Sequence, residues 1–242
     1  MKALILNSGM GSRLMPLTKD KPKCMTQLCE NETILSMQLK SLSLCGIKDI
    51  VITTGYEAEK LAKYGSELAH ELGISVRFVF NIFYDSTNYI YSVYLAEKYL
   101  HDDLLLLHGD LVFDPTILQG LLRADGSRMV VSSTATLPVK DFKAQIIGDR
   151  ITSIGTEIFE SAMAAQPLYK LVFDDWIIWL KEIVKFCEDG NRSCYAENAF
   201  NVVSNFCKLF PYDIKDLLCM EIDNIADFKY AKKVLNKKVQ EL

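Results

Sequence analysis

The stretch LILNSGMGSR, residues 4–13, combines the pattern of a buried strand with a glycine-containing loop. The apolar run at 2–6 predicts a central strand of a parallel sheet, because such strands are buried on both faces. Gly9 and Gly11 allow backbone N–H groups to approach an anion closely, and successive N–H groups form an anion-binding nest. The stretch therefore predicts an α/β fold in which the first strand leads into a phosphate-binding turn.

Two basic residues close to this loop support phosphate binding. Arg13 follows Gly11 directly after Ser12, and Lys23 closes the segment Lys-Pro-Lys ten residues later. Guanidinium and ammonium groups form charge-assisted hydrogen bonds with phosphate. The glycines alone are equally consistent with a tight turn beside surface charges. Leu14 stands where a dinucleotide fingerprint needs its third glycine, and the Gly-Lys-Ser/Thr of a Walker loop is missing, so we set both motifs aside.

Strand and helix patterns alternate through the first half of the chain. Strands are predicted at 2–6, 49–54, 75–80 and 104–108, with helices at 33–44, 58–72 and 88–100 between them. Gly46 and Gly73 stand where helix C-caps are expected. This alternation is typical of βαβ units and predicts a Rossmann-like α/β fold, a mostly parallel mixed sheet flanked by helices.

The second half is less regular and predicts a small C-terminal lobe. It contains a strand pattern at 129–134, a hairpin of 142–147 with 150–154, a helix at 174–188, a short strand at 200–203 and an amphipathic helix at 226–238. No Pro- or Gly-rich linker separates the halves. We therefore predict one domain, 1–242, with a nucleotide-binding half at about 1–125 and an acceptor-binding half at about 126–242.

Composition excludes several classes of protein. The sequence is 50% hydrophobic and 24% charged, as in packed globular domains, and its net charge of -4 argues against nucleic-acid binding. No apolar run reaches the ~20 residues of a membrane span, and the first residues lack the apolar core of a signal peptide. The seven cysteines include no Cys-x-x-Cys pair. We expect a cytoplasmic monomer or homodimer that contacts neither nucleic acid nor membrane.

Two aspartates follow predicted strands. Asp110 comes two residues after the strand at 104–108, and Asp223 follows the apolar run at 217–222. Mg²⁺ takes carboxylate and phosphate oxygens and keeps several waters, so two aspartates suffice as protein ligands. Taken alone, each is more commonly a turn or helix-capping residue, and Asp223 stands just before a helix expected near Ile225; only their place among the other motifs favours metal binding.

Asn88 and Ser92 are one helical turn apart and therefore share a face. The amide of Asn88 can pair with a pyrimidine edge, and the hydroxyl of Ser92 can reach a base or ribose. Asn88 can equally cap its own helix, and the two roles are compatible. Tyr56, directly after Gly55 and the strand at 49–54, is a weaker candidate for nucleotide contact.

Taken together, these motifs resemble the sugar-phosphate nucleotidyltransferase superfamily. Residues 9–23 are similar to its Gly-x-Gly-x-Arg signature followed by Lys-Pro-Lys, and residues 108–110 and 221–224 to its two metal-binding aspartates. Residues 87–92 are similar to the Asn-x-x-x-Ser segment of the short bacterial cytidylyltransferases that act on phosphocholine and related phospho- or phosphono-compounds. The four landmarks occur in the family's order over essentially the whole chain.

The resemblance implies an Mg²⁺-dependent cytidylyltransferase. CTP and a small phosphomonoester or phosphonate, phosphocholine first, would give a CDP-linked product and pyrophosphate. Arg13 and Lys23 would be catalytic, and Asp110 and Asp223 would hold the metal. The implied nucleotide-binding residues are Leu6, Asn7, Ser8, Gly9, Gly11, Ser12, Arg13, Lys23, Tyr56, Asn88, Ser92 and Gly109.

The acceptor side has three candidates. Lys143 resembles a lysine that contacts phosphate in relatives, and Tyr195 and Glu197 resemble the segment near a cationic head group. On an extended segment the latter two would share a face, and a ring with a carboxylate suits a quaternary ammonium. An exposed Glu beside a buried Tyr is the alternative. Trp176 and Trp179 are either core or pocket residues.

Other functions stay open at this point. A CTP:2-aminoethylphosphonate or CTP:phosphoglutamine-type cytidylyltransferase is the alternative within the same chemistry. A sugar-1-phosphate nucleotidyltransferase using UTP, TTP or GTP would share the fold, although the segment 88–92 and the short chain argue against it. A non-catalytic nucleotide-binding regulator is also possible, but such a protein would be free to lose Arg13, Lys23, Asp110 and Asp223.

Overall fold

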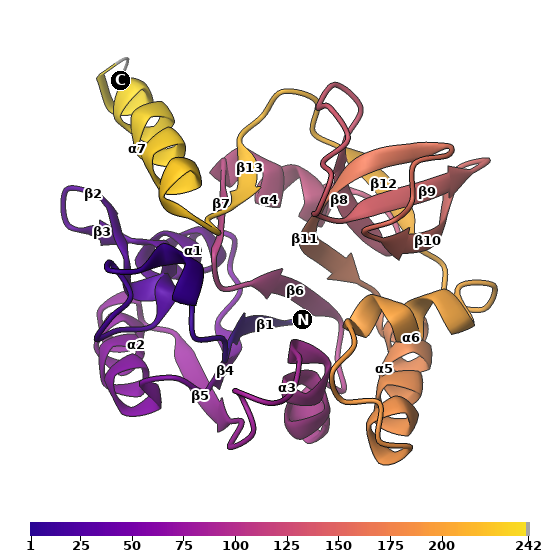
Figure 1. The fold of residues 1–242 in the computed structure, drawn as a ribbon, viewed down its shortest axis with the longest axis horizontal. Coiled ribbons are helices and arrows are strands. Elements are labelled where there is room, and N and C mark those ends of the chain that lie inside the picture. Colours follow the sequence, from indigo (N-terminus) through magenta and orange to yellow (C-terminus); the bar gives the residue numbers. More distant parts are fainter. Residues whose placement is uncertain (241–242) are drawn as a thin grey trace.

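A nine-stranded mixed sheet forms the centre of the molecule (Figure 1). The structure is a computed structural model that describes the backbone of residues 1–240 and the side chains of residues 1–236. The parallel part has the order β6-β1-β4-β5. Its strands are β1 (Lys2–Asn7), β4 (Asp49–Thr54), β5 (Ser75–Phe80) and β6 (Leu104–His108). They lie where the apolar runs predict them.

Helices cover both faces of this sheet. α1 (Ile34–Leu44), α2 (Ala58–Leu72) and α4 (Pro115–Arg123) pack on one face, and α3 (Tyr89–Ala96), α5 (Phe173–Glu188) and α6 (Ala196–Val203) on the other. Strand β1 serves both cores, because its alternate residues face opposite sides of the sheet. These two layers on one sheet confirm the predicted α/β fold.

The second half extends the same sheet rather than forming a separate one. β11 (Ala162–Leu171) pairs antiparallel with β6 and continues the sheet into the later part of the chain. The remaining strands on that side are β8 (Arg128–Ser132), β9 (Lys143–Ile147), β10 (Arg150–Gly155) and β12 (Phe210–Asp213). β9 and β10 form the predicted hairpin.

Short elements complete the fold. β7 (Leu111–Phe113) pairs antiparallel with β13 (Cys219–Glu221), and β2 (Gln27–Cys29) pairs with β3 (Glu32–Thr33). Single turns of 3₁₀ helix lie at η1 (Ser12–Leu14), η2 (Lys23–Met25) and η3 (Glu97–Tyr99). α7 (Ile225–Gln240) is the last element and packs beside β2. Among the residues described, no helix combines the length and apolar character that crossing a membrane would need.

One predicted element is wrong. The segment expected as a strand at 200–203 is the second half of helix α6, which begins at Ala196. Ala196, Ala199 and Phe200 are fully buried at helical spacing, and the Asn198 side chain accepts a hydrogen bond from the Tyr195 backbone N–H at 3.0 Å. The prediction that Tyr195 and Glu197 share one face of an extended segment is therefore also wrong, since Glu197 lies in the first turn of this helix.

Trp176 and Trp179 belong to the core. Both are fully buried in α5, and their indole N–H groups donate to the backbone oxygens of Leu100 at 3.0 Å and Ala196 at 2.8 Å. Trp179 packs against Phe200 with ring centroids 5.2 Å apart. Trp179 therefore fixes α5 against α6, and neither tryptophan is available to bind an acceptor.

Candidate active site

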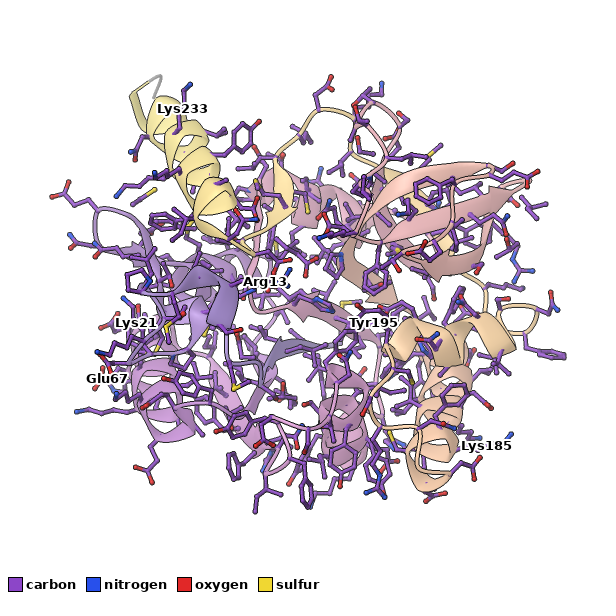
Figure 2. All side chains as sticks on the ribbon, viewed as in Figure 1. Arg13, Lys21, Glu67, Lys185, Tyr195 and Lys233 are labelled. Carbon is purple, nitrogen blue, oxygen red and sulfur yellow. The ribbon has the colours of Figure 1, made fainter. Side chains whose placement is uncertain are left out.

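A pocket of about 420 Å³ opens where the carboxyl ends of β1 and β6 lie side by side. Ligands of open α/β sheets bind at this edge, where the loops after the strands converge. Arg13 from the first half and Tyr195 from the second both line it (Figure 2). Other predicted residues in its wall are Leu6, Asn7, Ser8, Gly9, Gly11, Ser12, Lys23, Asn88, Ser92, Asp110 and Asp223.

Two glycines shape the floor of this pocket. Gly11 adopts a left-handed conformation with φ of 62°, and the Thr18 hydroxyl donates to its carbonyl oxygen at 2.8 Å. A Cβ on Gly109 would stand 1.7 Å from Asn7 Oδ1, so the chain after β6 can pass Asn7 only without a side chain. Gly109 therefore does not line the pocket itself, but it allows the close packing against Asn7, which does.

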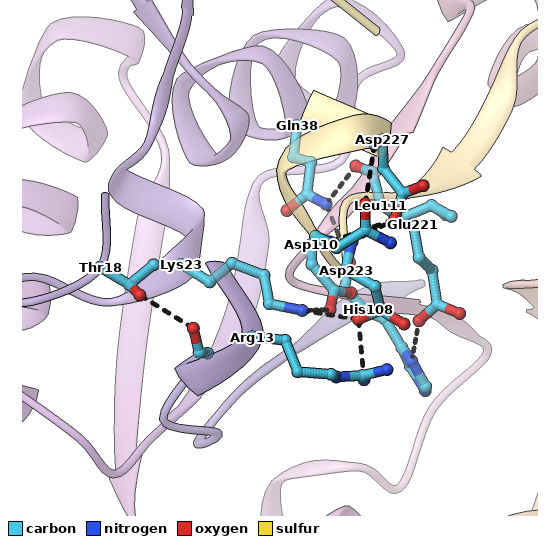
Figure 3. A network of polar contacts seen from close by, with 12 residues as sticks. Arg13, Thr18, Lys23, Gln38, His108, Asp110, Leu111, Glu221, Asp223 and Asp227 are labelled. Atoms are coloured by element: carbon cyan, nitrogen blue, oxygen red, sulfur yellow. Dashed lines mark hydrogen bonds and ion pairs between the residues drawn. The ribbon is translucent and has the colours of Figure 1, made fainter. Parts of the chain in front are cut away.

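Lys23 links the two predicted metal ligands. Its ammonium lies 2.5 Å from Asp110 Oδ2 and 2.9 Å from Asp223 Oδ1, and Arg13 Nη2 lies 3.1 Å from the same Asp223 oxygen (Figure 3). Burial lowers the pKa of Lys23, but the two carboxylates outweigh this and raise it. Burial likewise raises the pKa of Asp110, yet Lys23 and His108 bring it below its usual value. The pKa shifts of Lys23 and Asp110 therefore both favour the charged form in the free protein.

The β7–β13 pairing brings the two aspartates together. Asp110 immediately precedes β7 and Asp223 follows β13, and the Ile222 N–H donates to the Asp110 carbonyl at 2.9 Å. Asp223 is not the cap of α7. Asn224 Oδ1 accepts from the N–H groups of Ala226 and Asp227, which frees the Asp223 carboxylate to face Lys23 and Arg13.

The carboxylates of Asp110 and Asp223 fit a divalent cation of the kind the resemblance implies. An oxygen from each already contacts one positively charged atom, Lys23 Nζ. Two converging carboxylate oxygens, open to the pocket, are the set that Mg²⁺ uses together with substrate phosphates.

His108 and Glu221 form a second pair at the same wall, which the motif analysis did not single out. His108 Nδ1 lies 2.8 Å from Glu221 Oε1. Burial lowers the pKa of His108, but the hydrogen bond and charge of Glu221 raise it overall. Burial and the charge of Asp110 raise the pKa of Glu221. Each residue stands two positions before a predicted metal ligand, and this shared spacing is the signal that could have revealed them.

A polar network of Ser8, Asn81 and Ser92 borders one part of the pocket. The Ser92 hydroxyl donates to Ser8 Oγ at 2.9 Å, and Asn81 Nδ2 donates to Ser92 Oγ at 3.0 Å. Asn88 is the N-cap of α3, with its side chain accepting from the Tyr89 N–H at 2.7 Å, and it also lines the pocket. Asn88 thus caps α3 and also reaches the pocket, and its contact with a pyrimidine stays a prediction.

An aromatic wall, defined here as Tyr89, Phe142 and Tyr195, forms another part of the pocket lining. Ring centroids are 5.9 Å apart for Tyr89 and Tyr195, and 5.0 Å apart for Phe142 and Tyr195. Glu197 is only 1% exposed behind this wall, and it accepts hydrogen bonds from the hydroxyls of Tyr89 and Tyr169. Burial and the Glu197 charge raise the pKa of both tyrosines well above the usual value.

Comparison with known proteins agrees with this geometry. The pattern of the nucleotidyl transferase family matches residues 2–144. A choline-phosphate cytidylyltransferase from Streptococcus pneumoniae is 33% identical over 248 residues, which cover 97% of this chain and 98% of that protein. The chain belongs to the nucleotidyl transferase family.

Two further comparisons refine this placement. A CTP:phosphoglutamine cytidylyltransferase from Campylobacter jejuni is 33% identical over 137 residues, or 54% of this chain, and the match spans about half of that relative's length, 52%. The solved structure of a CTP:phosphocholine cytidylyltransferase from Streptococcus pneumoniae superimposes with a TM-score of 0.76 at 22% identity, over 97% of this chain and 98% of that one. The second comparison shows a common fold.

Besides Gly109, three predicted residues of this nucleotidyl transferase lie outside the pocket wall. Lys143 is fully buried, where its ammonium donates to the Pro138 carbonyl at 2.7 Å and lies 4.3 Å from the Phe159 ring centroid. Tyr56 donates to the Lys19 carbonyl at 2.5 Å instead. Glu197 stands behind the aromatic wall. Residues that the motif analysis missed in the wall are Met10, Asn81, Tyr84, Thr87, Tyr89, His108, Lys140, Asp141, Phe142, Thr156 and Glu221.

Proposed function

We propose that this nucleotidyl transferase moves CMP from CTP to a small phosphomonoester or phosphonate with a cationic head group, phosphocholine first, and releases pyrophosphate. One observation carries the proposal. The loop of Gly9, Gly11 and Arg13 and the aromatic wall with Glu197 behind it line a single pocket. A ring face backed by negative charge attracts a quaternary ammonium, and a cationic loop attracts phosphate.

The chemistry would be a single in-line displacement. A phosphate oxygen of the acceptor attacks the α-phosphorus of CTP, the bond from that phosphorus to the β-phosphate bridging oxygen breaks, and pyrophosphate leaves. Arg13 and Lys23 would stabilise the negative charge that collects on the transferred and leaving phosphates. Their pocket would also hold both substrates in line, which lowers the entropic part of the barrier. No covalent enzyme intermediate is needed.

Asp110 and Asp223 would hold Mg²⁺ in this proposal. When bound, the ion supplies charge neutralisation for the triphosphate, as in other phosphate-transfer sites. Support comes from the convergence of both carboxylates on Lys23 Nζ at 2.5 and 2.9 Å. Arg13, whose side chain is 72% exposed, has the freedom to reach a triphosphate from the same side.

A phosphorylated amide or an aminoethyl compound is the second candidate acceptor. Asp141 and Glu221 line the pocket, and their carboxylates could accept hydrogen bonds from an amide or a primary ammonium. A trimethylammonium group cannot donate such bonds. The relative named for phosphoglutamine supports this alternative over about half of this chain.

Pyrophosphate release, measured for each pairing of four nucleotides with a panel of acceptors, tests the proposal. The nucleotides are CTP, UTP, GTP and dTTP, and the acceptors are phosphocholine, 2-aminoethylphosphonate, phosphoethanolamine, phosphoglutamine, glycerol phosphate and sugar 1-phosphates. We expect release only with CTP, highest with an acceptor that carries a cationic or amide head group, and none with chelator. Preference for a sugar 1-phosphate with another nucleotide would overturn the proposal, and release with no pairing would favour a nucleotide-binding regulator.

A further inference from the structure

We propose that His108, Asp110 and Glu221 bind a divalent transition-metal ion, at a position distinct from the one between Asp110 and Asp223. One possible ligand atom from each of the three residues lies within 4.8 Å of the others. The position at His108 combines one imidazole with two carboxylates, whereas the position between Asp110 and Asp223 offers carboxylates alone. Asp110 belongs to both positions, so the two would be neighbours along the pocket wall.

The spacing suits coordination to one ion. Metal–nitrogen and metal–oxygen bonds of about 2.0–2.2 Å place neighbouring ligand atoms roughly 3–4 Å apart. His108 Nδ1 and Glu221 Oε1, now 2.8 Å apart as a hydrogen-bonded pair, would separate by only a few tenths of an ångström. The backbone fixes Glu221 beside the segment that follows His108, because β7 begins three residues after His108 and its Leu111 pairs with Glu221 of β13.

In the described part of the chain, the second nitrogen of the His108 ring has no partner that fixes which of the two nitrogens carries the proton. This atom, Nε2, is buried, and it has no hydrogen-bond partner among the residues that the structure describes. A buried polar atom without a partner is costly, so most such atoms in proteins contact a protein group, water or an ion. When Nε2 carries the ring proton, the Nδ1 lone pair faces the Glu221 carboxylate, and both can bind one ion.

The donor set and the local charge select the ion. Imidazole favours first-row transition metals over Mg²⁺, which prefers oxygen ligands alone. Three carboxylates, Asp110, Glu221 and Asp223, stand here against the two permanent cations Arg13 and Lys23. A divalent cation therefore enters a region where carboxylates outnumber fixed positive groups. Mn²⁺ is a suitable probe because it accepts both donor types and is visible in electron paramagnetic resonance.

The test uses the untagged full chain with one equivalent of Mn²⁺, without nucleotide or acceptor. Pulsed electron paramagnetic resonance then detects nitrogen bound directly to the ion. The sequence has three histidines, and His70 and His101 are both exposed away from the pocket. A His70→Gln/His101→Gln double variant is therefore the matched control for His108→Gln, and Asp223→Asn removes only the carboxylate-only position.

We expect the nitrogen signal in the wild type, the double variant and Asp223→Asn, and its loss in His108→Gln. We also expect the Mn²⁺ Kd of His108→Gln to rise roughly tenfold or more. A wild-type spectrum without bound nitrogen, or an unchanged Kd in His108→Gln, would overturn the inference. If His108→Gln fails to fold, a nitrogen signal that persists in the double variant can come only from His108. Because no substrate is present, the result is independent of whether the transferase proposal holds.

Discussion

Lys23 is the residue on which the charge balance of the pocket depends. It is the common partner of Asp110 and Asp223, and its side chain is only 15% exposed. Its raised pKa means that it remains an ammonium through the physiological range. A permanent cation held beside two carboxylates can neutralise them in the free protein, and in the proposed reaction it would also face the phosphates of the nucleotide.

Removing either basic residue of the loop should therefore slow the reaction more than it weakens the fold. We expect Lys23→Ala and Arg13→Ala each to lower kcat by about two to three decades, since one charge-stabilising donor contributes about 3–4 kcal/mol at a transition state. Steady-state kinetics at saturating CTP measure this, with Lys63→Ala on the exposed face of α2 as the matched control. Turnover close to that of the control in either variant would show that its assigned role is wrong.

The aromatic wall carries the second prediction at this scale. Tyr195→Leu removes a ring face from the pocket, and a cation on such a face gains about 2 kcal/mol, so the phosphocholine KM should rise about 30-fold. Glu197→Gln acts only through the tyrosines, because Glu197 is buried behind Tyr89, so its effect should be smaller. The CTP KM should stay constant in both.

The neutral isostere 3,3-dimethylbutyl phosphate serves as the control for this prediction. It has the shape of phosphocholine without the charge, so its KM should change little in Glu197→Gln. If neither variant shifts the phosphocholine KM beyond about twofold, far below the cation–ring contribution, the head group binds elsewhere.

At the scale of elements, two neighbouring residues between β13 and α7 have different roles, capping the helix and facing the pocket, which the sequence alone could not assign. Asn224 caps the helix through Ala226 and Asp227, while Asp223 faces the pocket. We expect Asn224→Ala to lower the free energy of unfolding by about 1 kcal/mol, the usual value of such a cap, and to retain most activity. Asp223→Asn should lose turnover with a smaller change in stability.

Urea unfolding and pyrophosphate release on the same preparations measure both effects. The reverse order, with Asp223→Asn fully active but less stable and Asn224→Ala unchanged in stability, would identify Asp223 as the cap.

Elements with long apolar patterns could be predicted from sequence, and short ones could not. β4, β5 and α2 have the predicted bounds, because the apolar run of β4, the alternating pattern of β5 and a helix closed by Gly73 are clear local signals. The four residues 200–203 are too few to distinguish a strand from a helix. Their conformation depends on Trp179, which packs on Phe200 from α5.

Some residues of the candidate site could likewise be predicted from the sequence, and others could not. Residues after a strand, such as Asn7 and Asp110, could be predicted because strand ends define the pocket edge. The burial of Lys143 depends on Pro138 and Phe159, and the position of Glu197 depends on Tyr89 across the molecule. Such tertiary contacts leave no periodic pattern in the sequence.

At the scale of the whole molecule, one sheet joins the two halves of the chain. β6 lies between β1, which leads into the loop of Gly9 and Gly11, and β11, which continues into the later half (Figure 1). The pocket at its carboxyl end receives residues from both halves, including Arg13 and Tyr195. A site built across this junction suits a reaction between two different phosphate compounds.

A competition in one tube tests this account most directly. The enzyme receives equal concentrations of CTP, UTP, GTP and dTTP with equal phosphocholine and glucose 1-phosphate, and mass spectrometry identifies the initial products. Because all substrates compete, the product ratio reports relative kcat/KM, which is discrimination at the transition state. We predict CDP-choline as the dominant product, accompanied by pyrophosphate. A nucleoside diphosphate sugar as the dominant product would contradict the account.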